Sequence, residues 1–173
     1  SAFFNRNTNS HVKVDNIFSS MENVSLSFWF KKGKGDREPL VQIAPMFVHF
    51  IESESRIRIK LHDDRDGNST RKKTTKVDFS PDYIKGEWNH LVATGNKNNE
   101  VQLFINGKEL SNNGVYREQD GGIYKETIIG AAKHFPQPSI GVERYHGSLD
   151  NIRIYNRIIT HEEIEEIYTK ERK

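Results

Sequence analysis

The sequence contains no cysteine among its 173 residues. No disulfide can therefore cross-link the fold, although secreted animal domains of this size usually carry disulfides. Their absence favours a bacterial or a cytosolic origin. Long apolar runs are absent as well: the longest, residues 40–51, is interrupted by Gln42, Pro45 and His49 and is too short to span a bilayer. The net charge is only +2, so the composition gives no overall attraction to nucleic acid or to a membrane.

The length suits one domain with a sizeable core and is short for two. The sequence shows no internal repeat and no linker long enough to separate two domains. It therefore predicts a single domain over residues 1–173. The chain opens directly into strand-like sequence, without a signal segment, so we expect it to be one module cut from a larger protein.

Alternating apolar and polar residues dominate the chain. The segments 24–30, 56–61 and 100–105 read as strands, with Arg56, Arg58 and Lys60 on the opposite face from the isoleucines between them. Asn106-Gly107 directly follows the third segment and predicts a type I′ hairpin turn. Further strands are predicted around 88–94 and 126–130. Turn-rich loops separate the strands at short intervals, which favours an all-β, two-sheet antiparallel β-sandwich.

The last thirty residues predict a strand followed by a helix. Ile152 and Ile154 continue the strand pattern, and Thr160 with Glu163 then forms a capping box that starts a helix. Three later apolar residues, Ile164, Ile167 and Tyr168, fall on one helical face. The sequence therefore predicts a short C-terminal helix that docks on the sandwich.

Four segments together resemble laminin-G-like, concanavalin-A-like lectin jelly rolls. They are N-V-S-L-S-F-W-F-K, G-E-W-N-H-L-V-A-T, V-Q-L-F-I-N-G-K-E-L and the closing run from Gly147 to Tyr168. The first and third are also similar to the lectin-like jelly roll of clostridial neurotoxin binding domains. The resemblance implies a jelly roll that recognises glycans or partner proteins and rarely catalyses a reaction.

Basic charge gathers in residues 56–76, where eight lysines and arginines stand against three aspartates. Arg56, Arg58 and Lys60 share one strand face and are candidates for binding sulfated, sialylated or uronate-rich glycans. A solvated outer face that discourages aggregation is the alternative reading. Nucleic acid is not expected, because no stacking aromatics interleave with the charges.

A sugar site also needs aromatic or planar polar side chains on loops or on the concave face. The remaining candidates for such a site are Tyr116, His134, Phe135, Arg144, Tyr145 and His146. The segments 134–138 and 144–146 are too polar and too interrupted by proline to be predicted as part of the hydrophobic core. Loop packing is the alternative role for each of these residues.

Asp150 is the candidate metal ligand. It shares strand parity with Ile152 and Ile154, so we expect its carboxylate to lean toward the core and to need compensation there. The resemblance implies a structural calcium site at this position, although Asn151 replaces the second acid that many relatives carry. A hydrogen bond to loop backbone is the alternative.

Catalysis is not expected. Glu52 and Glu54 are the nearest match to the acidic strand of jelly-roll glucanases, and they lack the third acid. The sequence thus predicts a non-catalytic, carbohydrate-binding module that acts outside the cell or on its surface. We expect it to be a monomeric unit within a multidomain protein, with a glycan or a cell-surface receptor as partner. A protein-binding, spacer or adhesion module is the alternative from another class.

Overall fold

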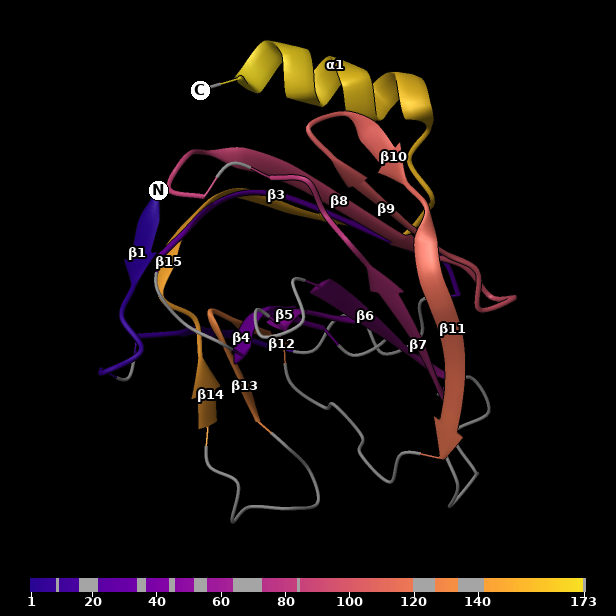
Figure 1. The fold of residues 1–173 in the computed structure, drawn as a ribbon, viewed down its shortest axis with the longest axis horizontal. Helices are drawn as coiled ribbons and strands as arrows, with labels where there is room; N and C mark the ends of the chain where they lie inside the picture. Colours follow the sequence, from indigo (N-terminus) through magenta and orange to yellow (C-terminus); the bar gives the residue numbers. More distant parts are fainter. Residues whose placement is uncertain are drawn as a thin grey trace.

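The computed structural model describes residues 1–8, 10–15, 22–33, 37–43, 46–51, 56–63, 73–83, 85–119, 127–133 and 142–172. Within these residues, two antiparallel sheets face each other across a hydrophobic core, and one helix lies outside them (Figure 1). The predicted all-β sandwich with a short C-terminal helix is confirmed.

The described strands form two large sheets and a small ribbon. The six-stranded sheet runs in the order β1 (Ala2–Phe4), β15 (Gly147–Tyr155), β3 (Val24–Lys32), β8 (Asn89–Gly95), β9 (Val101–Ile105) and β10 (Lys108–Leu110). The seven-stranded sheet runs in the order β11 (Asn112–Gln119), β7 (Lys73–Phe79), β6 (Arg56–Asp63), β5 (Met46–Ile51), β4 (Arg37–Gln42), β12 (Thr127–Ile129) and β2 (Val12–Val14). The ribbon of β13 (Ala131–Lys133) and β14 (Val142–Arg144) lies against β4.

Strand β3 is central to the six-stranded sheet and is buried on both faces. Leu26, Phe28 and Phe30 point between the sheets and belong to the main hydrophobic core. Trp29 points the other way and is also buried, because the C-terminal helix covers that face. The unbroken burial of Val24 to Phe30, serines included, follows from having core on one side and a helix on the other.

The hairpin between β9 and β10 confirms the turn expected at Asn106-Gly107. Both turn residues have positive φ, 51° and 79°, as a type I′ turn requires. The Asn106 side chain also fastens the turn to the sheet: its carbonyl oxygen accepts from the backbone N–H of His90, and its amide donates to Asn89.

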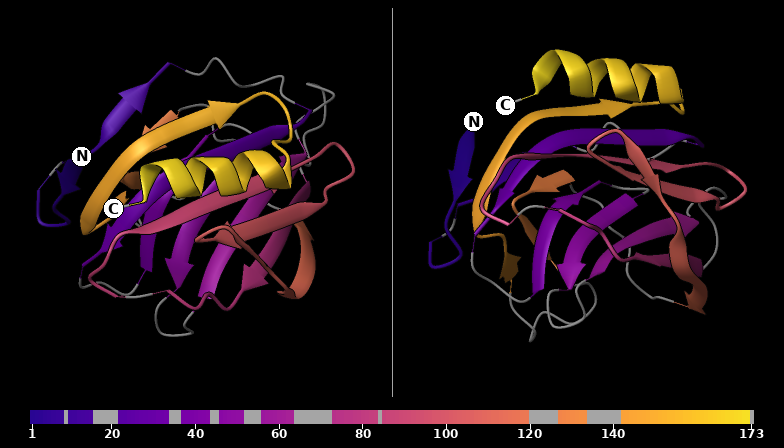
Figure 2. Two further views of the ribbon diagram at one scale, coloured as in Figure 1. Left: turned by 90° about the horizontal axis from the view of Figure 1, so that it is seen from above. Right: turned by 45° about the horizontal axis from the view of Figure 1, so that its top comes forward.

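The helix α1 (His161–Glu171) begins at the predicted capping box. The Thr160 hydroxyl accepts from the backbone N–H of Glu163, and the Glu163 carboxylate accepts from the backbone N–H of Thr160. Ile164 is buried against the six-stranded sheet, and Tyr168 stacks on Trp29 at 5.9 Å between ring centroids. Figure 2 shows α1 lying along the outer face of this sheet. Among the described residues, no helix has the length and apolar character that crossing a membrane demands.

Candidate functional site

The outer face of β6 and β7 carries the clustered basic side chains. Ile57 and Ile59 point into the core, so the alternating residues of β6 point outward, as the sequence predicted. Register places Arg58 opposite Asp78 of β7 and Lys60 opposite Lys76. We call the side chains Arg56, Arg58, Lys60, Lys76 and Asp78 the basic face.

Asp78 anchors the two arginines of the basic face. Its carboxylate is fully buried and accepts a two-point hydrogen bond from Arg58, with Nε at 2.6 Å and Nη2 at 2.7 Å. Arg56 Nη1 donates to the same carboxylate at 2.8 Å. The side chains of Arg56 and Arg58 remain 27% and 25% exposed. A buried carboxylate thus holds two half-buried guanidinium groups in fixed orientations at the surface.

Lys60 lies deeper than its neighbours. It is only 9% exposed, and its ammonium group sits 5.5 Å from the centroid of the Phe47 ring, a cation–π contact. Phe47 in turn stacks on His49, with ring centroids 4.7 Å apart. Phe47 is fully buried and packs against Ala132 of β13. Ala132 of the β13–β14 ribbon therefore covers Phe47, next to the Lys60 end of the basic face.

The other predicted sugar-contacting residues do not all join this face. His134 and Phe135 lie outside the described residues. Tyr116 is in β11, where its backbone is in register with Lys76, but its side chain is not among those described. Arg144 ends β14, and the ring of His146 makes an edge contact with Phe3 at 5.5 Å. Register thus brings the backbone of Tyr116 beside the basic face, while His146 contacts β1.

The expectation that the segment 144–146 stays out of the core is wrong for Tyr145. Its side chain is completely buried in the main core, and its hydroxyl donates to the backbone oxygen of Lys31. Burial, with the nearby Glu38 carboxylate as a second cause, raises the pKa of this hydroxyl well above its usual value. Tyr145 is therefore a structural residue and cannot stack on a sugar.

The expected orientation of Asp150 is also wrong. A β-bulge between Asp150 and Arg153 shifts the register of β15, and Asn151 within it adopts a positive φ of 49°. Leu149 therefore faces the core, while Asp150 lies opposite Trp29 on the helix-bearing side. Its carboxylate accepts the backbone N–H of Asn151 at 2.9 Å, which fits the alternative of a backbone hydrogen bond.

The surroundings of Asp150 do not fit a calcium site. Calcium takes six to eight oxygen ligands, usually with several carboxylates among them. Nowhere in the described part of the chain do three acidic, histidine or cysteine side chains gather in a way that could hold a metal ion. The amide nitrogen of the neighbouring Asn151 donates to the Glu171 carboxylate at 2.9 Å.

Sequence reasoning missed the role of Asp78. The signal was present, because Lys76 and Asp78 alternate with the core residues Val77 and Phe79 just as Arg56 and Arg58 alternate with isoleucines. What the sequence lacks is the register that pairs one strand with the other. The two facing antiparallel sheets with their shared core define a β-sandwich of the jelly-roll class.

The chain belongs to the concanavalin A-like lectin/glucanases superfamily, whose laminin-G-type family model matches residues 6–165. This confirms the resemblance drawn from the sequence. No curated protein matches the chain significantly.

Solved structures share the fold at low sequence identity. The chain is similar to a native heptameric SAP-like pentraxin from Limulus polyphemus, with a TM-score of 0.63, 13% identity, and 96% of this chain and 80% of that chain covered. It is similar to the ligand-binding domain of botulinum neurotoxin serotype D in complex with N-acetylneuraminic acid (TM-score 0.59, 14% identity, 93% and 39% covered). It is also similar to the binding domain of botulinum neurotoxin DC in complex with rat synaptotagmin II (TM-score 0.57, 13% identity, 88% and 37% covered). The chain thus spans less than half of either neurotoxin domain.

Proposed function

We propose that this protein is a non-catalytic glycan-binding module and that the basic face binds an anionic glycan. The observation that carries the proposal is the pair of arginines oriented by one buried carboxylate. Guanidinium groups match the planar geometry of carboxylates and sulfates, and groups already held in place lose less entropy when a ligand binds.

The charge of this face supports an anionic ligand. Among its described side chains, four are basic and one is acidic, which leaves a surplus of three positive charges (4 − 1). Lys60 and Lys76 stand directly opposite each other, which places two ammonium groups beside the two arginines. A further support is that the neurotoxin domain, which shares this fold over 39% of its own length, is in complex with an anionic sugar, N-acetylneuraminic acid.

The acid–base chemistry of the face argues against hydrolysis. A glycosidase needs two carboxyl groups facing the scissile bond, separated by about 5–10 Å. The basic face as described contributes one, Asp78, and two arginines already bind it. We infer binding without catalysis, and an extracellular or cell-surface location where such glycans occur. Modest affinity per module would gain from repetition within a larger protein.

The test is a glycan array that includes sulfated, sialylated and uronate-containing glycans, followed by titration of the best hit at increasing salt. We expect hits confined to anionic glycans and binding that weakens as salt rises. Arg58→Gln should weaken binding about tenfold or more, since it removes a charge-assisted contact. Lys97→Ala, in an exposed turn, removes one positive charge elsewhere and serves as the matched control.

Three results would count against this proposal. They are a blank array, hits on neutral glycans alone, and a folded Arg58→Gln variant that binds as the unchanged protein does. Far-UV circular dichroism checks the fold of each variant. Lys76→Glu, at a half-buried site of the same face, tests the charge without removing an arginine from Asp78.

A protein partner is the second candidate, favoured by exposed apolar side chains on two edge strands. Phe3 of β1 is 63% exposed, and Val12 and Val14 of β2 are also exposed. Apolar side chains gathered at an edge are typical of protein-binding surfaces. A blank glycan array, together with receptor binding that Phe3→Ser abolishes, would favour this function instead.

A further inference from the structure

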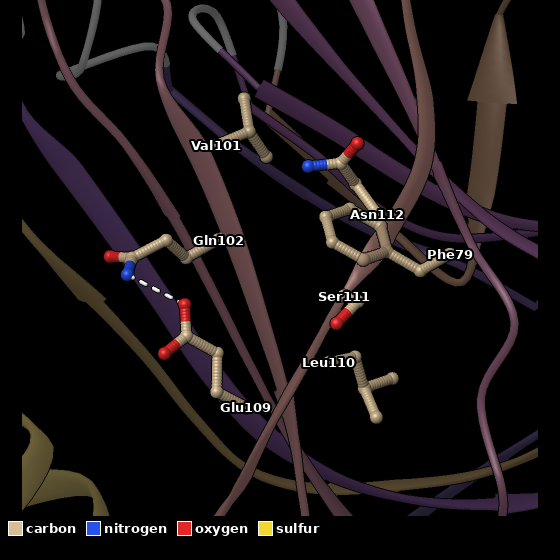
Figure 3. A pocket seen from close by; sticks show the side chains of 7 residues that line it. All are labelled: Phe79, Val101, Gln102, Glu109, Leu110, Ser111 and Asn112. Atoms are coloured by element: carbon tan, nitrogen blue, oxygen red, sulfur yellow. Dashed lines mark hydrogen bonds between the residues drawn. The ribbon is translucent and has the colours of Figure 1, made fainter.

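A pocket opens where the chain passes from one sheet to the other. Strand β10 ends at Leu110, opposite Leu103, and the chain then leaves β9 to begin β11 in the seven-stranded sheet. The fork between β9 and this departing segment borders an open pocket of about 430 Å³ (Figure 3). We call it the fork pocket; its lining residues are Phe79, Val101, Gln102, Glu109, Leu110, Ser111 and Asn112. The volume falls within the roughly 300–1,000 Å³ of ligand pockets.

The lining combines an apolar part with polar groups on two sides. Phe79 is almost fully buried, while Val101 and Leu110 are partly exposed beside it. Figure 3 shows Gln102 and Glu109 reaching toward each other on one side, with Ser111 and Asn112 on the other. The Gln102 amide donates to the Glu109 carboxylate at 2.8 Å and so fixes its orientation. This composition suits a ligand with both apolar and hydroxyl-bearing surfaces.

The side chains of Gln102, Glu109, Ser111 and Asn112 are exposed, so their remaining hydrogen-bonding positions are open to solvent or to a ligand. In the described structure, Glu109 accepts a side-chain hydrogen bond from Gln102 alone, and the side chains of Ser111 and Asn112 make none. A carboxylate offers about four acceptor positions, and an amide both donates and accepts. Glu109 is also the one charged group in the lining, so the pocket is negative and disfavours an anion.

We propose that the fork pocket is a second binding site, for a neutral sugar ring. The C–H face of a pyranose would lie against Leu110, Val101 and the edge of Phe79. Its hydroxyl groups would donate to the Glu109 carboxylate and exchange hydrogen bonds with Asn112 and Ser111. The site is opposite in charge to the basic face, so the two would select different sugars. It stands on its own geometry and does not depend on the basic face.

The experiment is an NMR titration of the ¹⁵N-labelled protein with glucose, galactose, mannose and N-acetylglucosamine, and separately with N-acetylneuraminic acid. At about 50 mM sugar, where even sites of millimolar affinity fill, at least one neutral sugar should shift the amides of residues 101–102 and 109–112. N-acetylneuraminic acid should leave these amides unmoved. Glu109→Ala and Asn112→Ala should each weaken the neutral sugar about tenfold or more, because each removes hydrogen bonds to it.

Lys108→Ala is the matched control, since Lys108 is an exposed residue of the same strand but does not line the pocket. The proposal is overturned if no neutral sugar moves these amides, if Glu109→Ala leaves the shifts unchanged, or if the anionic sugar moves them equally. Amides of β6 and β7 report on the basic face in the same spectra. Failure at one site is therefore distinguishable from failure at the other.

Discussion

Lys32 and Glu38 form an ion pair inside the sandwich, with 3.0 Å between the ammonium nitrogen and the nearer carboxylate oxygen. Both side chains are buried, and the lysine also lies over the ring of Phe50. Removing two charges from water costs several kcal/mol each, a cost that their mutual attraction only partly offsets. We therefore expect the fold to tolerate both charged side chains or neither, but not one alone.

Removing either member should therefore be far more harmful than replacing both. Glu38→Ala or Lys32→Ala should each lower the free energy of unfolding by about 3–5 kcal/mol, because an unpaired charge stays buried. The double variant Lys32→Met with Glu38→Leu should be close to the unchanged protein. Urea unfolding of all three checks this. A double variant as unstable as either single one would show that the ion pair itself stabilises the fold.

His90 makes stability depend on pH. It lies beneath α1, with its Nε2 2.9 Å from the Ser27 hydroxyl and its ring in contact with those of both Trp29 and Tyr168. Burial lowers its pKa from 6.5 to about 4, against an opposing effect of Glu171 and a small supporting one of Arg153. Between pH 6.5 and pH 4, His90 therefore binds a proton in the unfolded chain but stays neutral in the folded chain.

The contribution of neutral His90 to the free energy of unfolding is therefore complete above pH 6.5 and is lost as the pH falls toward 4. The loss should reach about 3 kcal/mol. His90→Gln should flatten the unfolding free energy over this range, whereas His161→Gln, at an exposed site, should not. An NMR titration that gives His90 an ordinary pKa would contradict the prediction.

Local patterns predicted the strands, the turn and the helix start because each depends on neighbours in sequence. Asn106-Gly107 forms its turn wherever the flanking strands pair, and Thr160 with Glu163 caps the helix through contacts three residues apart. The alternation of Arg56 and Arg58 was equally local. Long-range register was not available, so the carboxylate that joins the two arginines, Asp78, went unrecognised.

The errors in the candidate site come from features of the folded chain that the sequence pattern around each residue does not carry. A single bulge at Asn151 inverted the expected direction of Asp150, since each one-residue shift exchanges the two faces of a strand. Tyr145 looked like loop sequence, yet its hydroxyl finds the Lys31 carbonyl 114 residues away, and that contact permits burial. The fork pocket depends on where β10 stops, which no periodicity reveals.

Glu171 at the end of α1 should hold the helix to the sheet. Its carboxylate accepts from Arg153, from the Asn151 amide and from the indole N–H of Trp29. Glu171→Ala should destabilise the fold by about 1–2 kcal/mol and shift the indole N–H signal of Trp29. Glu166→Ala removes an exposed pair with Lys170 and should do neither. Equal effects of the two variants would mean that the anchor contributes nothing specific.

Calcium at Asp150 stays a prediction of the family resemblance, and thermal unfolding tests it. A structural calcium ion would raise the melting temperature in calcium relative to chelator, and Asp150→Asn would remove that difference. From the geometry of the described residues we expect no difference in either protein. A calcium-dependent rise that Asp150→Asn abolishes would contradict this expectation and restore the metal site.

The turn glycine Gly107 offers a test of how tightly the helix covers the hairpin. Its φ is +79°, and a Cβ added there would lie 3.3 Å from a ring carbon of Tyr168. Gly86 has nearly the same φ, +80°, with nothing within 4 Å of the added carbon. Gly86→Ala should thus cost only the backbone term of roughly 1–2 kcal/mol.

Gly107→Ala should cost that term and more, because Tyr168 must give way by a few tenths of an ångström where it stacks on Trp29 and His90. Urea unfolding gives the difference between the two variants, and Trp29 fluorescence reports whether the stack moves. Adding Tyr168→Ala to each variant completes the comparison, because it should remove the excess cost at Gly107 and leave the cost at Gly86 unchanged. If Gly107→Ala lowers the free energy of unfolding no more than Gly86→Ala does, the helix moves without cost. Its contact with the turn then does not constrain the hairpin.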